Sequence, residues 1–158
     1  MNYLFHDSIG FVHLLSAITA LITGTCILTL KKGTQTHIRI GYIYAISMLI
    51  VNITAFMIYR LFGGFGIFHI AALVSLVTLL GGMIPALLRK PKSTWLTLHF
   101  SFMYWSVMGL YAAFASEVLT RVPESPFFGM VGIATGFIML AAGVYFYFGK
   151  HRWGEVEA

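Results

Sequence analysis

Four histidines are the residues of this sequence whose type and spacing could do chemistry. They are His13, His37, His69 and His99, and each falls near one end of a different apolar stretch. An ionisable side chain inside a membrane span is costly and therefore indicates a functional role. The first and third stretches carry theirs near one membrane face, the second and fourth near the other. Alternate helices of an antiparallel bundle are diagonal partners, so the sequence predicts two cross-bundle pairs, His13 with His69 and His37 with His99.

The sequence offers few other metal-binding side chains near these histidines, and this indicates which cofactor a histidine pair would bind. Zinc is usually bound by four ligands, so two histidines alone make a poor zinc site. Haem supplies four nitrogens of its own, and two histidines then leave no open iron position, which favours electron transfer. The single cysteine, Cys26, leaves no CxxCH motif for covalent attachment. The sequence therefore predicts one or two haems b with four candidate axial ligands: His13, His69, His37 and His99. His37 falls closer to the membrane surface than His99 and could instead be a surface residue, in which case a single haem between His13 and His69 is expected.

Haem propionates need cationic partners, and arginines or lysines at the span ends could supply them. The main candidates are Arg39 on one side and Arg60 on the other. Further candidates are Lys31, Lys32, Lys92 and Arg121. The alternative for each of these residues is a charge that sets topology or reaches the lipid headgroups.

The composition predicts an all-α, polytopic membrane protein. Of the 158 residues, 59% are hydrophobic and only 9% charged, and the mean hydropathy is +0.87, which no ordinary soluble domain matches. Stretches of roughly 18 or more apolar residues span a bilayer. We expect one transmembrane domain over residues 1–158, in which the first four helices form an antiparallel four-helix core. The predicted spans are residues 9–30, 38–62, 65–88, 95–119 and 127–148.

The basic residues predict the orientation of these spans. Lysines and arginines gather in the loops after the first and third spans and in the C-terminal tail, whereas only Arg60 and Arg121 fall on the other side. The positive-inside rule then places the N-terminus outside and the C-terminus in the cytoplasm. These loop positions also argue for lipid contact and against a nucleic-acid partner. Gly132 and Gly136 form a GxxxG pair, which could be a homodimer face.

Two other classes of function stay open. No carboxylate falls in the middle of a span, which disfavours a cation-coupled transporter. The histidines could instead bind copper or zinc transiently in an accessory or transport protein, or bridge helices by hydrogen bonds. Soft ligands for copper would be methionines within the spans, although core packing is their commoner role: Met48, Met57, Met83, Met103 and Met108. The chain could also be a structural subunit of a larger complex.

The histidine pattern resembles that of the ascorbate-dependent transmembrane cytochromes b with two haems. The match rests on His13, His37, His69 and His99 and covers roughly residues 9–116, although that family usually has six helices. It implies a membrane b-type cytochrome, and so a transmembrane oxidoreductase, that carries electrons between a quinol or small reductant and an acceptor.

A closer local resemblance is to an uncharacterised bacterial membrane family. It is carried by the stretch Gly-Thr-Gln-Thr-His-Ile-Arg-Ile-Gly-Tyr at residues 33–42, with His69 opening the next helix and His99 the one after. This resemblance implies a bacterial inner-membrane protein of a few helices. It also implies that His37 and Gly41 belong to a motif.

Overall fold

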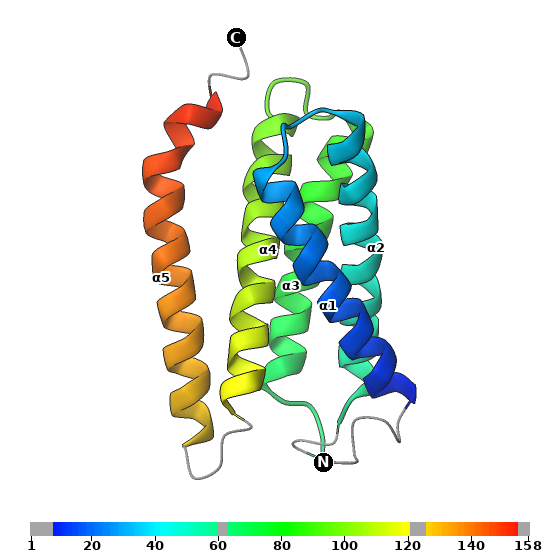
Figure 1. Cartoon of the computed structure of the whole chain (residues 1–158), viewed down its shortest axis with the longest axis vertical. Coiled ribbons are helices and arrows are strands. Elements are labelled where there is room, and N and C mark those ends of the chain that lie inside the picture. The colour runs from blue at the N-terminus through cyan, green and yellow to red at the C-terminus, as the bar shows by residue number, and fades with distance from the viewer. Residues whose placement is uncertain (1–7, 60–62, 121–125, 155–158) are drawn as a thin grey trace. The chain divides into compact units, whose positions relative to one another are not determined.

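Five helices make up the part of the chain that the computed structural model describes, which is residues 8–59, 63–120 and 126–154. They are α1 (Ser8–Thr29), α2 (Gln35–Met57), α3 (Ile67–Leu88), α4 (Trp95–Leu119) and α5 (Phe127–Gly154) (Figure 1). No strand occurs in these three ranges. The predicted all-α fold with five helices is therefore confirmed.

Side chains are distributed in the way that a lipid environment requires. All five helices are long and apolar enough to cross a membrane. Large apolar side chains such as Ile22 and Val77 face outward, with 61% and 57% of their surface exposed. Polar side chains lie inside instead, among them Asn52 and Ser106, which are 2% and 1% exposed. Apolar residues outside and polar residues within are favourable only where lipid surrounds the helices.

Two helices end at positions that the sequence did not predict. Helix α2 begins at Gln35 and ends at Met57, whereas the predicted span ran from residue 38 to 62. Ile58 already has extended backbone angles (φ −99°, ψ 98°), and residues 60–62 lie outside the described ranges. Helix α5 continues to Gly154 and so passes the predicted end at residue 148. An apolar run indicates how much chain can lie in lipid, whereas backbone hydrogen bonds set the helix ends.

The first four helices close on one another within the compact unit formed by residues 1–107. Helix α1 packs against α2, and α2 packs against α3. A Cβ on Gly81 of α3 would lie 2.8 Å from the ring of Phe102 in α4. A Cβ on Gly24 of α1 would lie 3.1 Å from the Tyr44 ring in α2 and 3.3 Å from Val107 in α4. Glycines thus make room for side chains of the neighbouring helices, and the predicted four-helix core is confirmed.

The interior of this bundle is well filled. Tyr44, Met48, Leu79 and Val107 are at most 1% exposed. The Tyr44 hydroxyl lies 2.8 Å from the Ser106 hydroxyl, which satisfies both polar groups where no water is available.

Residues 108–158 form the second compact unit. In it, the Ser116 hydroxyl of α4 lies 3.1 Å from the Thr135 hydroxyl of α5. Nothing lies within 4 Å of the Cβ positions that Gly132 and Gly136 would have.

Candidate functional site

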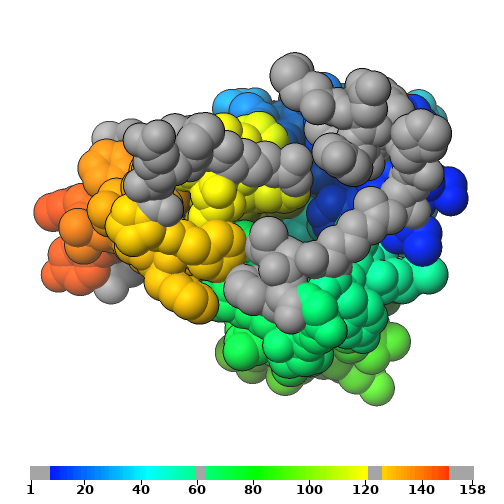
Figure 2. Space-filling view, turned by 90° about the horizontal axis from the view of Figure 1, so that it is seen from below, coloured from blue at the N-terminus to red at the C-terminus, as the bar shows by residue number. Residues whose placement is uncertain are grey.

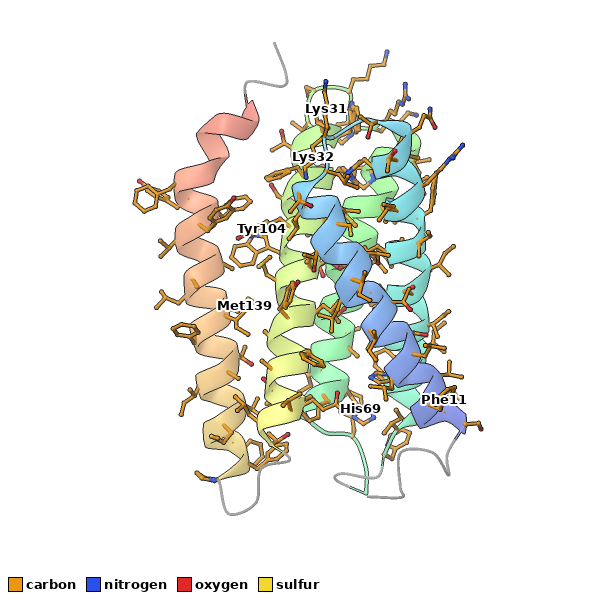
Figure 3. The ribbon with its side chains drawn as sticks, viewed as in Figure 1. Phe11, Lys31, Lys32, His69, Tyr104 and Met139 are labelled. Carbon is orange, nitrogen blue, oxygen red and sulfur yellow. The ribbon has the colours of Figure 1, made fainter. Side chains whose placement is uncertain are left out.

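The helices carry the four histidines at two opposite ends of the bundle. The start of α1, with His13, and the start of α3, with His69, lie at one end, together with the end of α2. The start of α2, with His37, and the start of α4, with His99, lie at the other. We call these the His69 end and the His99 end. Figure 3 shows His69 near Phe11 at the first, and Lys31 and Lys32 at the second, and Figure 2 looks onto the His69 end, with α1 in blue and α3 in green.

The turn before α2 explains half of the motif at residues 33–42. Gly33 has φ +74°, a left-handed conformation that glycine adopts without strain. Thr34 is the N-cap of α2, and its hydroxyl accepts a hydrogen bond of 3.2 Å from the backbone N–H of His37. His37 is thereby held in the first turn of the helix, where its Nδ1 is buried without a hydrogen-bond partner. Gly41 has nothing within 4 Å of its Cβ position, and no packing contact explains a glycine there.

Removing the Thr34 cap should destabilise the start of α2. We expect Thr34→Ala to lower the free energy of unfolding by about 1 kcal/mol, because one N–H in the first turn loses its acceptor. Circular dichroism during unfolding of the detergent-solubilised protein by sodium dodecyl sulfate measures this difference. Thr36→Ala, an exposed position in the same turn, is the matched control. Equal losses for both variants would contradict the role given to Thr34.

His99 is oriented by a backbone carbonyl of the neighbouring helix. Its Nδ1 lies 2.9 Å from the oxygen of Gly82 in α3. A carbonyl can only accept, so Nδ1 carries the proton, and Nε2 of the neutral ring carries the lone pair. The arrangement is the one by which proteins orient metal-binding histidines. Pro85 in α3 lacks the N–H that would bond to the Gly81 carbonyl, so the proline does not itself free the Gly82 carbonyl.

Lys32 brings a positive charge to the same end. Its ammonium donates to the carbonyl oxygens of Ile27 and Leu28 at 2.6 and 2.8 Å, which caps the C-terminus of α1. Partial burial lowers the pKa of Lys32 below its ordinary value. His37 is close enough to both Lys32 and His99 to experience their charges. Lys32, His37 and His99 therefore lie near one another at this end of the bundle.

Other basic side chains surround this region. Lys31, Arg39 and Lys92 are exposed at the His99 end. Arg60 and Arg121, the candidates proposed for the other end, lie outside the described residues.

At the His69 end, a hydroxyl orients His13. Its Nδ1 lies 2.8 Å from the Thr54 hydroxyl oxygen in α2. That hydroxyl donates its only proton to the Ile50 or Val51 carbonyl, at 2.7 and 3.0 Å. Thr54 must therefore accept from Nδ1–H of His13, and Nε2 of the neutral ring carries the lone pair.

His69 has the opposite proton arrangement. The backbone N–H of Gly66 donates to its Nδ1 at 3.1 Å, so His69 caps α3 as Glu or Gln does at the same position of a capping box. Nδ1 then carries the lone pair, and Nε2 of the neutral ring carries the proton. Nε2 is buried without a partner, and His69 is only 3% exposed. The rings of Tyr59 and Phe65 stack against the imidazole, with centroids 4.8 and 4.9 Å away.

Comparison with known proteins places the chain in a family. The family model described as predicted membrane protein (DUF2306) matches residues 10–148. The chain belongs to this family. No curated protein and no solved structure matches it. The resemblance to an uncharacterised membrane family is thus confirmed, and the resemblance to the two-haem cytochromes stays a prediction.

Whether this member of DUF2306 could hold haem depends on which nitrogens offer lone pairs. At the His99 end the residues fit: His99 presents Nε2, and His37 has a buried nitrogen without a partner. At the His69 end, His69 would first have to release the Gly66 N–H to ligate a metal through Nε2. The predicted His13–His69 ligand pair therefore requires a change of hydrogen bonding at His69 that His99 does not need.

The described residues offer few grouped side chains that could bind copper or zinc. Within residues 8–59, 63–120 and 126–154, no group of three or more His, Cys, Asp or Glu side chains could hold a metal ion. The methionines considered for copper are dispersed: Met48 is 1% exposed in the core, whereas Met57 is 54% exposed.

Several residues that organise the site were not found from the sequence. Thr54, Gly66 and Gly82 supply the hydrogen-bond partners of His13, His69 and His99. A histidine three residues after a glycine at a helix start is a weak capping signal that could have indicated Gly66. The other two depend on how neighbouring helices are aligned.

Proposed function

We propose that this protein is a membrane b-type cytochrome in which His37 and His99 hold one haem at the His99 end. The observation that carries the proposal is the hydrogen bond from His99 Nδ1–H to the Gly82 carbonyl, which directs the lone pair to Nε2. His37 lies near His99 at the same end, with a buried nitrogen that has no partner. When bound, the haem would supply a one-electron carrier with both axial positions filled.

The cations at the His99 end support the proposal. The Lys32 ammonium has one N–H left after its two bonds to α1 carbonyls, and it could donate this N–H to a propionate. Arg39 lies at the same end, but two residues after His37 and so on another side of α2. Lys32 would bind and orient the cofactor, and it would not have to react.

The protein would carry electrons between a quinol or small reductant and an acceptor in the bacterial cytoplasmic membrane. The basic loops support an orientation with the His99 end at the cytoplasmic face and the N-terminus outside, because Lys31, Lys32, Arg89, Lys90 and Lys92 all lie at that end. Pairing of two copies through Gly132 and Gly136 is supported by the open space at both positions.

The absorption spectrum of the purified protein tests the proposal. In detergent, after expression with added haem precursor, we expect a Soret band, a sharp α-band after reduction with dithionite, and one haem per chain. Two haems per chain would require the His13–His69 pair as well. A colourless protein, still colourless after incubation with haem, would exclude a cytochrome.

A further inference from the structure

The buried Nε2–H of His69 is a donor that the fold leaves unused. Capping of α3 explains why His69 Nδ1 accepts a hydrogen bond from the Gly66 N–H, but it does not involve His69 Nε2. A buried donor without an acceptor costs about 1–3 kcal/mol, and lipid supplies no water to offset this cost. Some other molecule that carries an acceptor would remove it.

The surroundings of His69 define the chemistry of such a molecule. The capped Nδ1 fixes the ring, so Nε2–H keeps one direction. Tyr59 and Phe65 cover the two sides of the imidazole at tilts of 29° and 27°, and the Phe56 ring centroid lies 6.4 Å away. These rings offer apolar, stacking surfaces and no positive charge. They suit a planar, lipid-soluble molecule with a neutral acceptor and do not suit an anion.

The covering rings are able to make room for a ligand. Tyr59 is 48% exposed and Phe65 is 65% exposed, so each covers His69 with one face and is open on the other. Neither residue lies in a helix, so both side chains can move beside the imidazole without displacing one. His69 itself would stay in place because its backbone and Nδ1 hold it to Gly66.

We propose that His69 binds a lipid-soluble quinone, with Nε2–H donating to a quinone carbonyl oxygen between Tyr59 and Phe65. A quinone combines the two features that the site selects, a flat ring that stacks on aromatic side chains and a carbonyl acceptor at its edge. The quinol form of the same molecule would be the electron donor of the proposed cytochrome, and in that respect the inference rests on the proposed function. Binding itself requires no haem. A phospholipid ester carbonyl is the other membrane acceptor, and it lacks the ring.

Infrared spectroscopy of the carbonyl groups tests this inference on the full-length protein in phospholipid nanodiscs, with menadione as the probe. We expect the carbonyl band of bound menadione to shift to lower frequency, as hydrogen bonding to a carbonyl does. His69→Glu should abolish the shift and weaken binding about tenfold, because an ionised carboxylate cannot donate, while Glu keeps the cap on Gly66. Thr36→Gln, a change at an exposed position of the opposite end, should keep both the shift and the affinity.

The remaining outcomes overturn the quinone site. An unshifted menadione band, together with a lipid ester band that is shifted only when His69 is present, would assign the donor to phospholipid. No shift in either band would leave His69 without a carbonyl ligand. If His69→Glu does not fold, nitrogen NMR of the histidine-labelled wild-type protein tests the same contact, because bound menadione must shift the Nε2 resonance of His69. Failure of the cytochrome proposal can be distinguished from failure of the quinone site, because we expect His99→Gln to lack the proposed haem and still to bind menadione.

Discussion

His99→Ala should leave the purified protein almost without haem. The substitution removes both the Nε2 lone pair and the ring that the Gly82 carbonyl orients at 2.9 Å. Removal of a residue that only hydrogen-bonds a metal ligand typically lowers metal affinity about 10–100-fold. Removal of the ligand itself should therefore lower the haem content at least tenfold. His37→Ala should have the same effect, because a single axial histidine would remain. Haem per chain, measured after extraction, gives the comparison.

His13→Ala is the matched control at the His69 end. It removes a histidine of similar depth that bonds Thr54 at 2.8 Å, and we expect it to retain the full haem content. Imidazole added to His99→Gly should restore the α-band, which a merely structural role of His99 would not produce. If His13→Ala lost as much haem as His99→Ala, the assignment of the haem to the His99 end would be wrong.

Gly82→Val should separate α3 from α4 and remove the haem together with part of the stability. A Cβ at this position would lie 2.8 Å from Cγ and Sδ of Met103 and 3.1 Å from its backbone nitrogen. The Met103 side chain could move, but the backbone could not move without shifting α4. Overpacking of this kind costs about 1–3 kcal/mol, and the displaced Gly82 carbonyl would no longer orient His99.

Two measurements on Gly82→Val check this expectation. The free energy of unfolding in detergent should fall by the amount given, and the haem content should fall with it. Gly41→Val adds the same bulk to α2, where nothing lies within 4 Å of the Cβ position, so it should change neither quantity by much. A Gly82→Val protein with wild-type stability and haem would contradict the close packing of α3 on α4.

Much of the fold follows from the sequence because lipid imposes a simple rule. Apolar runs long enough to span a bilayer predicted five helices, and the bounds of α4 agree with the prediction at both ends. The end of α2 was not predictable in the same way. Residues 58–62 continue the apolar run except for Arg60, yet the backbone leaves the helix at Ile58, and Tyr59 stacks on His69 instead.

The candidate site was predictable only in part. Histidine positions along the chain indicated which end of the bundle each would occupy, because helix length and direction determine this. Proton positions were not predictable, because they depend on the partner of each Nδ1. His99 and His69 are the same residue type near helix starts, but Gly82 O accepts from one and Gly66 N–H donates to the other. This difference separates a candidate metal ligand from a candidate hydrogen-bond donor.

Electron paramagnetic resonance of the oxidised protein tests the central claim, that two histidines hold one haem at the His99 end. With nitrogen-labelled histidine, the proposal predicts a low-spin ferric signal coupled to two histidine nitrogens. The couplings should disappear in His37→Ala and His99→Ala and persist in His13→Ala. A high-spin signal, a coupling to a single histidine nitrogen, or no ferric haem signal at all in the wild-type protein would contradict the proposal.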